Sequence, residues 1–161
     1  MDEGAQFFSE GTEPGTAARE ELGRYGERTA GGGVSFRCAT CGEAAAVIRL
    51  ADAGTAVNMG PPFGEQRHLR DGVVIDYWLG GTCWRTVDAA TLARINAVLA
   101  TVRPDPAALH AIDWELVPFW CRTCQRCYCR SDWRTTVVSD GPFYDWTEGV
   151  CPAGHRQMID G

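Results

Sequence analysis

The stretch "WCRTCQRCYCRSDW" (residues 120–133) decides the fold, because it places four cysteines within nine residues of one another. Disulfides, nucleophilic thiols and metal ligands are the three chemical uses that such close spacing leaves open. Cys121 and Cys124 have two residues between them, a spacing that lets both sulfurs face one ion across a short turn. The stretch therefore predicts part of a metal site.

The composition favours metal over disulfides. The chain has 161 residues, the size of one domain, and the segment "MDEGAQFFSEGTEPG" (1–15) lacks the basic and apolar regions of a secretory signal. There is also no run of eighteen apolar residues, so we expect a cytoplasmic protein without a membrane segment. In a reducing compartment, eight cysteines indicate metal ligands rather than cross-links.

The charged residues exclude several classes of function. All fifteen basic residues are arginine, which excludes Schiff-base chemistry, pyridoxal phosphate catalysis and P-loop nucleotide hydrolysis, since each needs a lysine. The net charge is −6, of which −4 lies in residues 1–32 and −2 in residues 33–161. A nearly neutral body does not indicate binding along duplex DNA.

The chain divides into an arm and one domain. Residues 1–32 are predicted to form a flexible N-terminal arm with a possible short helix from Thr16 to about Arg28, and residues 33–161 a single zinc-stabilised α+β domain. Short apolar runs predict strands of a small antiparallel sheet, the last two joined by a two-residue turn at Gly80-Gly81. These runs are 44–50, 55–59, 72–79 and 82–87, with a further strand at 134–139.

Two helices are predicted at the centre of the domain. Asp88 is placed to cap a helix over 89–102, and Asp105-Pro106 begins a second helix over 106–112 in the usual order of cap and proline. The first helix has one apolar face, made of Leu92, Ile95, Val98, Leu99 and Val102. The fold class is α+β, with a zinc-knuckle part, ribbon-like or treble-clef-like, at the C-terminus.

Four pairs of candidate ligands follow one another along the chain. Cys38 and Cys41 repeat the spacing of Cys121 and Cys124, and Gly42 permits the tight backbone after the pair. The segment "CPAGH" (151–155) offers a cysteine and a histidine. The last pair is either Cys129 with Asp132 or Cys127 with Cys129. Two pairs make one closed tetrahedral site, so one or two zinc ions are predicted, with sequential or interleaved pairing.

The C-terminal segment resembles a type of bacterial zinc-binding protein, mostly uncharacterised, whose tail runs CxxCxxxYCxxHW, then an FYD turn, then GxCPxGH. The resemblance covers about the last forty residues and implies zinc binding with no defined activity. The matching residues are Cys121, Cys124, Tyr128, Cys129, Trp133, Phe143, Tyr144, Asp145, Gly149, Cys151, Pro152, Gly154 and His155.

This chain departs from that pattern at Asp132, where the pattern has histidine, so the second site uses a carboxylate oxygen or recruits Cys127 instead. If the pairs interleave, as in cross-brace domains, one ion is held by Cys121, Cys124, Cys151 and His155. The other ion is then held by Cys38, Cys41, Cys129 and either Asp132 or Cys127.

Three further residues are candidate functional groups. Cys83 is predicted to be a small buried residue in a strand, with a nucleophile served by His68 or His110 as the alternative. His68 lies in a loop beside Arg67 and Arg70 that is predicted to be a solvated hairpin, with an anion cradle as the alternative. His110 is predicted to be a helix residue outside the site.

Arginines recur every four residues beside aromatic residues in this part of the chain. Arg122, Arg126, Arg130 and Arg134 neighbour Trp120, Tyr128 and Trp133. They either offset the negative charge of zinc thiolates or form a surface for single-stranded nucleic acid or an acidic peptide.

We expect a non-catalytic interaction or scaffold protein with structural zinc sites and a protein partner. The alternatives are a zinc protein that binds RNA or single-stranded DNA, and an enzyme dependent on zinc or on Cys83. The two commonest zinc-enzyme motifs, H-x-E with P-C-x-x-C and H-E-x-x-H, do not occur. The sequence indicates no catalytic residues and no oligomeric state.

Overall fold

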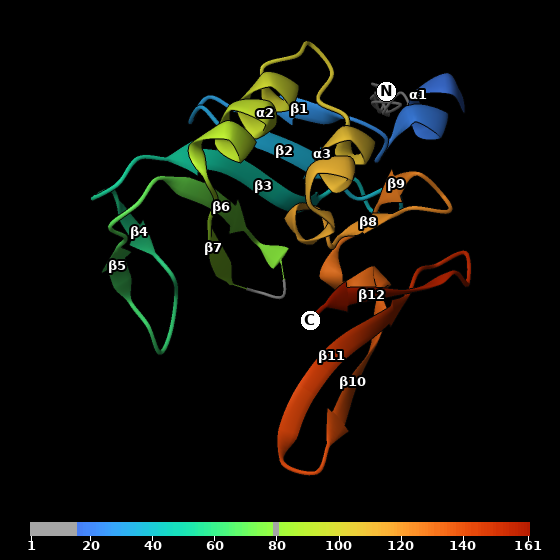
Figure 1. The fold of residues 1–161 in the computed structure, drawn as a ribbon. Helices are drawn as coiled ribbons and strands as arrows, with labels where there is room; N and C mark the ends of the chain where they lie inside the picture. Colours follow the sequence, from blue (N-terminus) through green and yellow to red (C-terminus); the bar gives the residue numbers. More distant parts are fainter. Residues whose placement is uncertain (1–15, 79–80) are drawn as a thin grey trace, which may run out of the picture.

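The computed structural model describes residues 16–78 and 81–161, which form a mixed, sheet-rich α+β fold. A five-stranded antiparallel sheet in the order β1-β2-β3-β6-β7 makes the body, and a three-stranded sheet in the order β10-β11-β12 extends from it (Figure 1). The strands of the main sheet are β1 (Gly26–Arg28), β2 (Val34–Arg37), β3 (Ala44–Ala51), β6 (Gly72–Asp76) and β7 (Thr82–Thr86).

The helices cover one face of the main sheet instead of standing at the centre of the fold, so that part of the prediction was wrong. Figure 1 shows α2 (Ala89–Leu99) and α3 (Pro106–Ile112) side by side over this face. Ile95 and Leu109 are fully buried in the same cluster as Phe36. An antiparallel sheet needs one covering layer to bury its apolar face, and two short helices supply it.

Both predicted helix starts are confirmed. The Asp88 carboxylate accepts a hydrogen bond from the amide of Thr91, and Asp105 accepts one from the amide of Ala107. The first helix ends at Leu99, three residues before Val102, which is 96% exposed. Val102 was therefore assigned wrongly to the apolar face, because the chain leaves the helix before that face completes another turn.

A separate hairpin covers the other face. β4 (Ala56–Asn58) pairs only with β5 (Glu65–Arg67) among the described strands, so the prediction that 55–59 joins the main sheet was wrong. Val57 from this hairpin packs with Val74 of β6 in a small second cluster. Since Val73 and Ile75 face the helices, strand β6 is buried on both sides.

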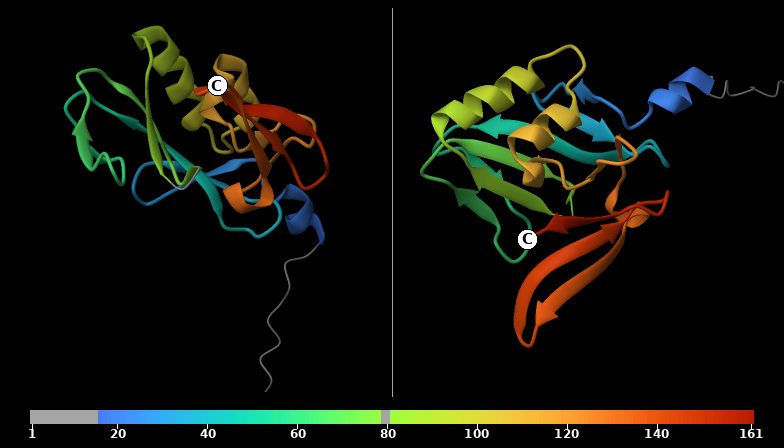
Figure 2. Two further views of the ribbon diagram at one scale, coloured as in Figure 1. Left: turned by 90° about the horizontal axis from the view of Figure 1, so that it is seen from below. Right: turned by 45° about the vertical axis from the view of Figure 1, so that its right-hand side comes forward.

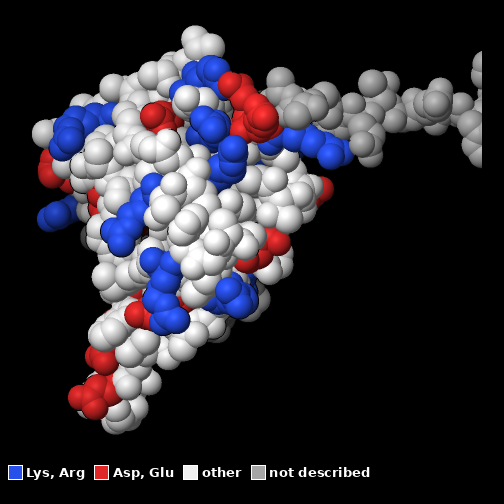
Figure 3. Space-filling model, turned by 90° about the vertical axis from the view of Figure 1, so that its right-hand side faces the viewer, with Lys and Arg blue, Asp and Glu red and all other residues white. Residues whose placement is uncertain are grey.

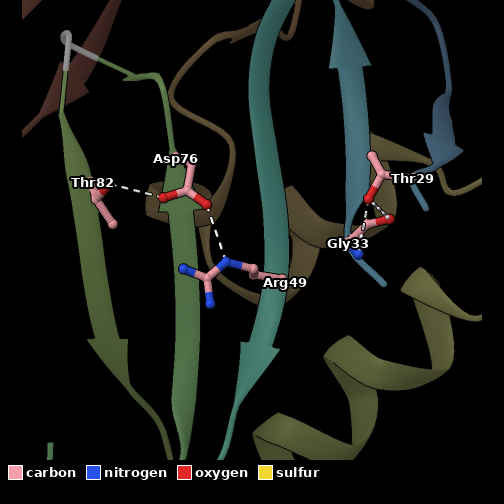
Figure 4. A network of polar contacts seen from close by, with 5 residues as sticks. All are labelled: Thr29, Gly33, Arg49, Asp76 and Thr82. Atoms are coloured by element: carbon pink, nitrogen blue, oxygen red, sulfur yellow. Dashed lines mark hydrogen bonds and ion pairs between the residues drawn. The ribbon is translucent and has the colours of Figure 1, made fainter. Parts of the chain in front are cut away.

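Polar contacts tie the middle strands together where the chain turns from β6 to β7. The Asp76 carboxylate accepts hydrogen bonds from Arg49 Nε (3.1 Å) and from Thr82 Oγ1 (2.8 Å), as Figure 4 shows. Because Asp76 pairs with Thr82 in the strand register, five residues separate the strands, and the predicted two-residue turn at Gly80-Gly81 was wrong. Residue 80 lies outside the described part of the chain.

The N-terminal segment differs from the predicted arm. Helix α1 spans Thr16–Glu21 and does not continue to Arg28. Gly23 has a positive φ of 80°, which ends the helical path, and Gly26–Arg28 then pairs with β2 as an edge strand. Part of the segment assigned to a flexible arm thus belongs to the main sheet, while residues 1–15 lie outside the description.

The C-terminal third forms a hairpin-rich lobe that projects from the body (Figures 1 and 2). Its elements are η2 (Trp114–Leu116), β8 (Trp120–Cys121), β9 (Arg126–Cys127), η3 (Arg130–Asp132), β10 (Arg134–Asp140), β11 (Phe143–Val150) and β12 (Arg156–Asp160). The strand predicted at 134–139 is confirmed as β10. Within the described residues, no helix is both long enough and apolar enough to span a membrane.

Replacing Ile95 by alanine should lower the free energy of unfolding by about 2–5 kcal/mol, because it leaves a cavity between α2 and the sheet. Val102→Ala is the matched control: its side chain is exposed, so it should change stability by less than about 0.5 kcal/mol. Urea unfolding of the two variants and the wild type measures both effects. Equal losses would contradict the assignment of Ile95 to the core and of Val102 to the surface.

Candidate metal centres

The first candidate centre, here called the Cys3His site, lies at the base of the C-terminal lobe. Its ligand atoms all lie within 4.8 Å of one another. His155 Nδ1 lies 3.0 Å from Cys124 Sγ and 3.5 Å from Cys151 Sγ, and the two sulfurs are 3.6 Å apart. Cys121 Sγ completes the group at 3.9 Å from the histidine nitrogen.

The second candidate centre, here called the Cys3Asp site, joins the main sheet to the lobe. Asp132 Oδ2 lies 2.9 Å from Cys38 Sγ and 3.0 Å from Cys129 Sγ. Cys41 Sγ lies 3.8 Å from Cys129 Sγ, and all four ligand atoms again fall within 4.8 Å of one another. Cys41 is exposed and Cys38 buried, so this site stands at the surface with one side against the core.

The size of both groups fits a tetrahedral metal ion. A Zn–S bond of roughly 2.3 Å gives a ligand tetrahedron with edges of about 3.8 Å, slightly less where a nitrogen or oxygen replaces sulfur. The observed separations of 2.9–3.9 Å approach these edges. Sulfur, imidazole and carboxylate donors in fours are also the ligand types that zinc takes in proteins. Each set of residues can therefore hold one ion.

The two CxxC turns are built alike. In the first turn the amide of Gly42 donates to the carbonyl of Cys38 (2.9 Å), and in the second the amide of Gln125 donates to the carbonyl of Cys121 (2.7 Å). Gly42 and Gln125 both have positive φ, 77° and 54°. The glycine is a turn signal in the sequence, whereas Gln125, which was not predicted, stands at the same place, four residues after the first cysteine.

Backbone amides point at the sulfurs within these turns. The amide of Thr40 donates to Cys38 Sγ and the amide of Cys124 donates to Cys121 Sγ, each at 3.4 Å. Such bonds stabilise a thiolate and are a usual feature of metal knuckles. In the turn from Cys151 to His155, burial raises the pKa of Cys151. Hydrogen bonds, first from the amide of His155, outweigh this effect and bring the pKa down to about 7.

Other ligand sulfurs hold their protons tightly when no metal is bound. Burial raises the pKa of Cys38 to about 12, with the hydrogen bond to Asp132 as the next cause. Burial also raises the pKa of Cys121 to about 12. A bare thiolate at either place would be unfavourable, and a divalent cation is the partner that makes the charged form stable there.

The two groups interleave along the chain. The pairs 38/41 and 129/132 form one site, and the pairs 121/124 and 151/155 form the other, so each site skips one pair. A short η3 turn brings Cys129 and Asp132 together, since the amide of Asp132 donates to the carbonyl of Cys129. Of the two pairings left open by the sequence, the structure has the interleaved one.

Cys127 belongs to neither group. Its side chain is only 1% exposed and lies in the core, and burial raises its pKa well above the usual thiol range. Its backbone joins three segments: its carbonyl accepts from the amide of Ala39, and its amide donates to the carbonyl of Gly23. The structure therefore places Asp132, and not Cys127, among the atoms of the Cys3Asp site.

The structure does not assemble the proposed thiol nucleophile. Cys83 lies exposed on strand β7, so the prediction of a buried residue was wrong, and its pKa is raised, first by surrounding protein atoms. The ring of His68 stacks on the ring of Trp84, with 4.1 Å between their centroids. Trp84 follows Cys83 in strand β7, and successive strand residues point to opposite faces of a sheet, so His68 does not lie beside Cys83. His110 packs on Trp120 at 5.1 Å, outside both metal groups, as predicted.

The segment before His68 forms the β4–β5 hairpin, as predicted, and Arg67 makes contacts within it. His68 itself is half-buried against Trp84, so the prediction of a solvated loop was wrong at this residue. The Arg67 guanidinium donates to the carbonyl of Gly54 (2.9 Å) and pairs with Glu65 (3.6 Å). These internal contacts leave Arg67 poorly placed to cradle an anion.

The arginines of the predicted basic and aromatic surface are exposed or half-buried, but the aromatic rings are buried. Trp120, Tyr128 and Trp133 are at most 7% exposed, which argues against the alternative of a stacking surface for nucleic acid and leaves the charge-offsetting role of the arginines as the favoured interpretation. Arg126 donates to the backbone carbonyl of Glu20 (2.6 Å). Figure 3 shows arginines with acidic side chains among them on this side of the molecule, without a continuous basic stripe.

Comparison with known proteins identifies a family and no activity. The family described as a domain of unknown function (DUF8328) matches residues 27–161. The chain belongs to this family. No curated protein and no solved structure matches the chain. The match begins within strand β1, so it includes the whole of β2 and every residue of both candidate centres.

Replacing Cys127 by alanine should leave the metal content unchanged and lower the stability by about 1 kcal/mol, because it removes a buried sulfur from the core. Native mass spectrometry measures the metal content, and urea unfolding measures the stability. Loss of a metal ion from this variant would show that Cys127 is a ligand after all.

Proposed function

We propose that this chain is a non-catalytic interaction or scaffold module whose shape is held by two structural zinc ions. The observation that carries the proposal is the presence of two complete sets of four ligands, each assembled from segments far apart in the sequence. Cys38 and Asp132 are 94 positions apart, and Cys121 and His155 are 34 apart. The tail pattern noted in the sequence also supports zinc.

Zinc is the metal that these ligands favour. Three thiolates in each site select a soft or borderline ion, and hard cations such as Mg²⁺ and Ca²⁺ prefer all-oxygen sites. The Cys3His site arranges its ligands as a zinc ribbon does, with one turn between β8 and β9 and the other between β11 and β12. The charge of three thiolates and Zn²⁺ is −1, which a nearly neutral domain tolerates.

The Cys3Asp site carries more negative charge, and basic groups lie close to it. Three thiolates, one carboxylate and Zn²⁺ sum to −2. Arg37 donates to the carbonyl of Gly42 (3.0 Å), inside the first CxxC turn. Arg37 also pairs with Glu27 (3.2 Å), so it offsets the charge of the site only in part.

A structural role is favoured because each ion would have four protein ligands. Tetrahedral zinc with four such ligands has no position for water or substrate, whereas catalytic zinc keeps one open. Closing loops of 34 to 94 residues removes much of the freedom of the unfolded chain, so metal binding stabilises the fold strongly.

Native mass spectrometry of protein purified without added metal tests the proposal. The wild type should carry two zinc ions. Cys151→Ser should lose one and Cys129→Ser should lose the other, since each removes a ligand from one site. Cys83→Ser is the matched control: it changes an exposed thiol outside both groups and should keep two ions.

Three outcomes would contradict the proposal. One is a wild type with no zinc under conditions where it is folded by circular dichroism. Another is loss of both ions from Cys83→Ser. A third is retention of both ions by Cys129→Ser together with Asp132→Ala, which would remove the Cys3Asp site from the assignment.

Removing the metal should unfold the module. A strong chelator added to wild type should abolish the near-ultraviolet circular dichroism of the buried tryptophans, because Trp120 and Trp133 lie beside ligand residues. Added Zn²⁺ should restore the signal. An unchanged spectrum after both ions are shown to be gone would contradict a structural role.

Nucleic-acid binding is the less favoured alternative, since the aromatic rings that would stack on bases are buried. Binding of a single-stranded oligonucleotide through the exposed Arg122 and Arg134 would weaken steeply between low and physiological salt. We expect no binding that depends on salt in this way, and fluorescence anisotropy measures it.

A further inference from the structure

Strand β10 is an exposed edge of the three-stranded sheet. The sheet order β10-β11-β12 leaves one side of β10 without a partner strand among the described residues. Figures 1 and 2 show the β10–β11 hairpin standing away from the body. Six of its seven residues are exposed and the seventh, Val138, is half-buried. Its outward amides and carbonyls are available for strand pairing.

The edge lacks the usual protection against pairing. Exposed edge strands are normally interrupted by a proline, a bulge or a charge in mid-strand. The five central residues of β10 are uncharged and rich in β-branched side chains: Thr135, Thr136, Val137, Val138 and Ser139. The hairpin's irregularity falls on β11, where Asp145 is the extra residue, so β10 itself carries no bulge.

The charges at the two ends of β10 make the strand complementary to itself. Two copies paired antiparallel about Val137 place Arg134 of one copy opposite Asp140 of the other, twice by symmetry. Neither Arg134 nor Asp140 has an ion pair or side-chain hydrogen bond to another described residue. Opposite charges directly across a strand pair are stabilising, and like charges are destabilising.

The same register suits the residues between the charges. Thr135 lies opposite Ser139, and Thr136 lies opposite Val138, on alternating faces. Val137, which is 62% exposed, meets its own copy at the symmetry axis and loses water-exposed apolar surface. A shift by two residues would set Arg134 against Val138 or move it past the end of the strand, so the charges select one register.

We propose that the chain forms a twofold symmetric dimer through antiparallel pairing of β10 with β10 of a second copy. The two three-stranded sheets then form one continuous six-stranded sheet across the axis. The contact is a single strand pair with few buried side chains, so the dimer forms and dissociates with concentration and is not permanent. This proposal does not depend on the identity of the metal.

Analytical ultracentrifugation of the full chain over a wide concentration range tests the proposal. The wild type should pass from monomer to dimer. Arg134→Asp and Asp140→Arg should each raise the dissociation constant by about tenfold or more, because each places like charges opposite one another twice. The double variant, with both changes, should return to within about threefold of the wild type, because the pairs are restored in reverse.

Asp145→Arg is the matched control, since it makes the same charge change on the same hairpin but on β11, away from the β10 edge. It should dimerise as the wild type does. Native mass spectrometry of every variant measures the metal content, so a variant that has lost its metal sites is recognised separately from one that has lost only the dimer.

Hydrogen exchange gives a second measurement. The amides of residues 134–140 should become more protected as the concentration of wild type rises, while β12 should not change. A wild type that stays monomeric at all concentrations would overturn the proposal. So would a dimer that survives both single variants, or one that the double variant fails to restore.

Discussion

The meeting of sulfur and carboxylate ligands across 94 positions of the chain is the constraint on which the rest of this structure depends. Cys38 stands where strand β2 of the main sheet ends, and Asp132 stands just before β10 of the projecting lobe. The body and the lobe have separate sheets, so backbone ladders do not hold them together. The two parts share one hydrophobic core, and the Cys3Asp site and the backbone bonds of Cys127 also join them, so the proposed zinc ion would act at that junction.

The interleaving explains why the lobe is closely packed at its base and exposed at the tip of its hairpin. The Cys3His site fixes the β8–β9 turn to the turn between β11 and β12, and Trp133 packs closely over the lobe at Gly149. A Cβ added at Gly149 would lie only 2.8 Å from the Trp133 ring, so the glycine permits this contact. Beyond it, Val137 and Phe143 are exposed. Burial therefore decreases along the hairpin with distance from the ligands.

Local signals in the sequence predicted the local features well. Cap residues at Asp88 and Asp105, and the spacing of cysteine pairs, depend on a few neighbouring residues, and each led to the right element or grouping. The errors concern where elements meet. Nothing adjacent to 55–59 indicates that this strand leaves the main sheet, and the arginines around Trp120, Tyr128 and Trp133 left open whether these rings are exposed or buried. Their burial comes from packing against distant strands and helices.

Asp132 shows that the chemical types of the residues in a sequence do not by themselves identify the members of a site. An aspartate among cysteines reads as a weak substitute for histidine, and the buried thiol of Cys127 is chemically the better zinc ligand. The backbone excludes Cys127 from the site, because its hydrogen bonds with Ala39 and Gly23 place its side chain in the core. The η3 turn instead brings Asp132 beside Cys129. Geometry set by the main chain outweighs ligand affinity, because moving Cys127 into the Cys3Asp site would break the backbone bond between Cys127 and Ala39, which holds the neighbouring Cys38 in place.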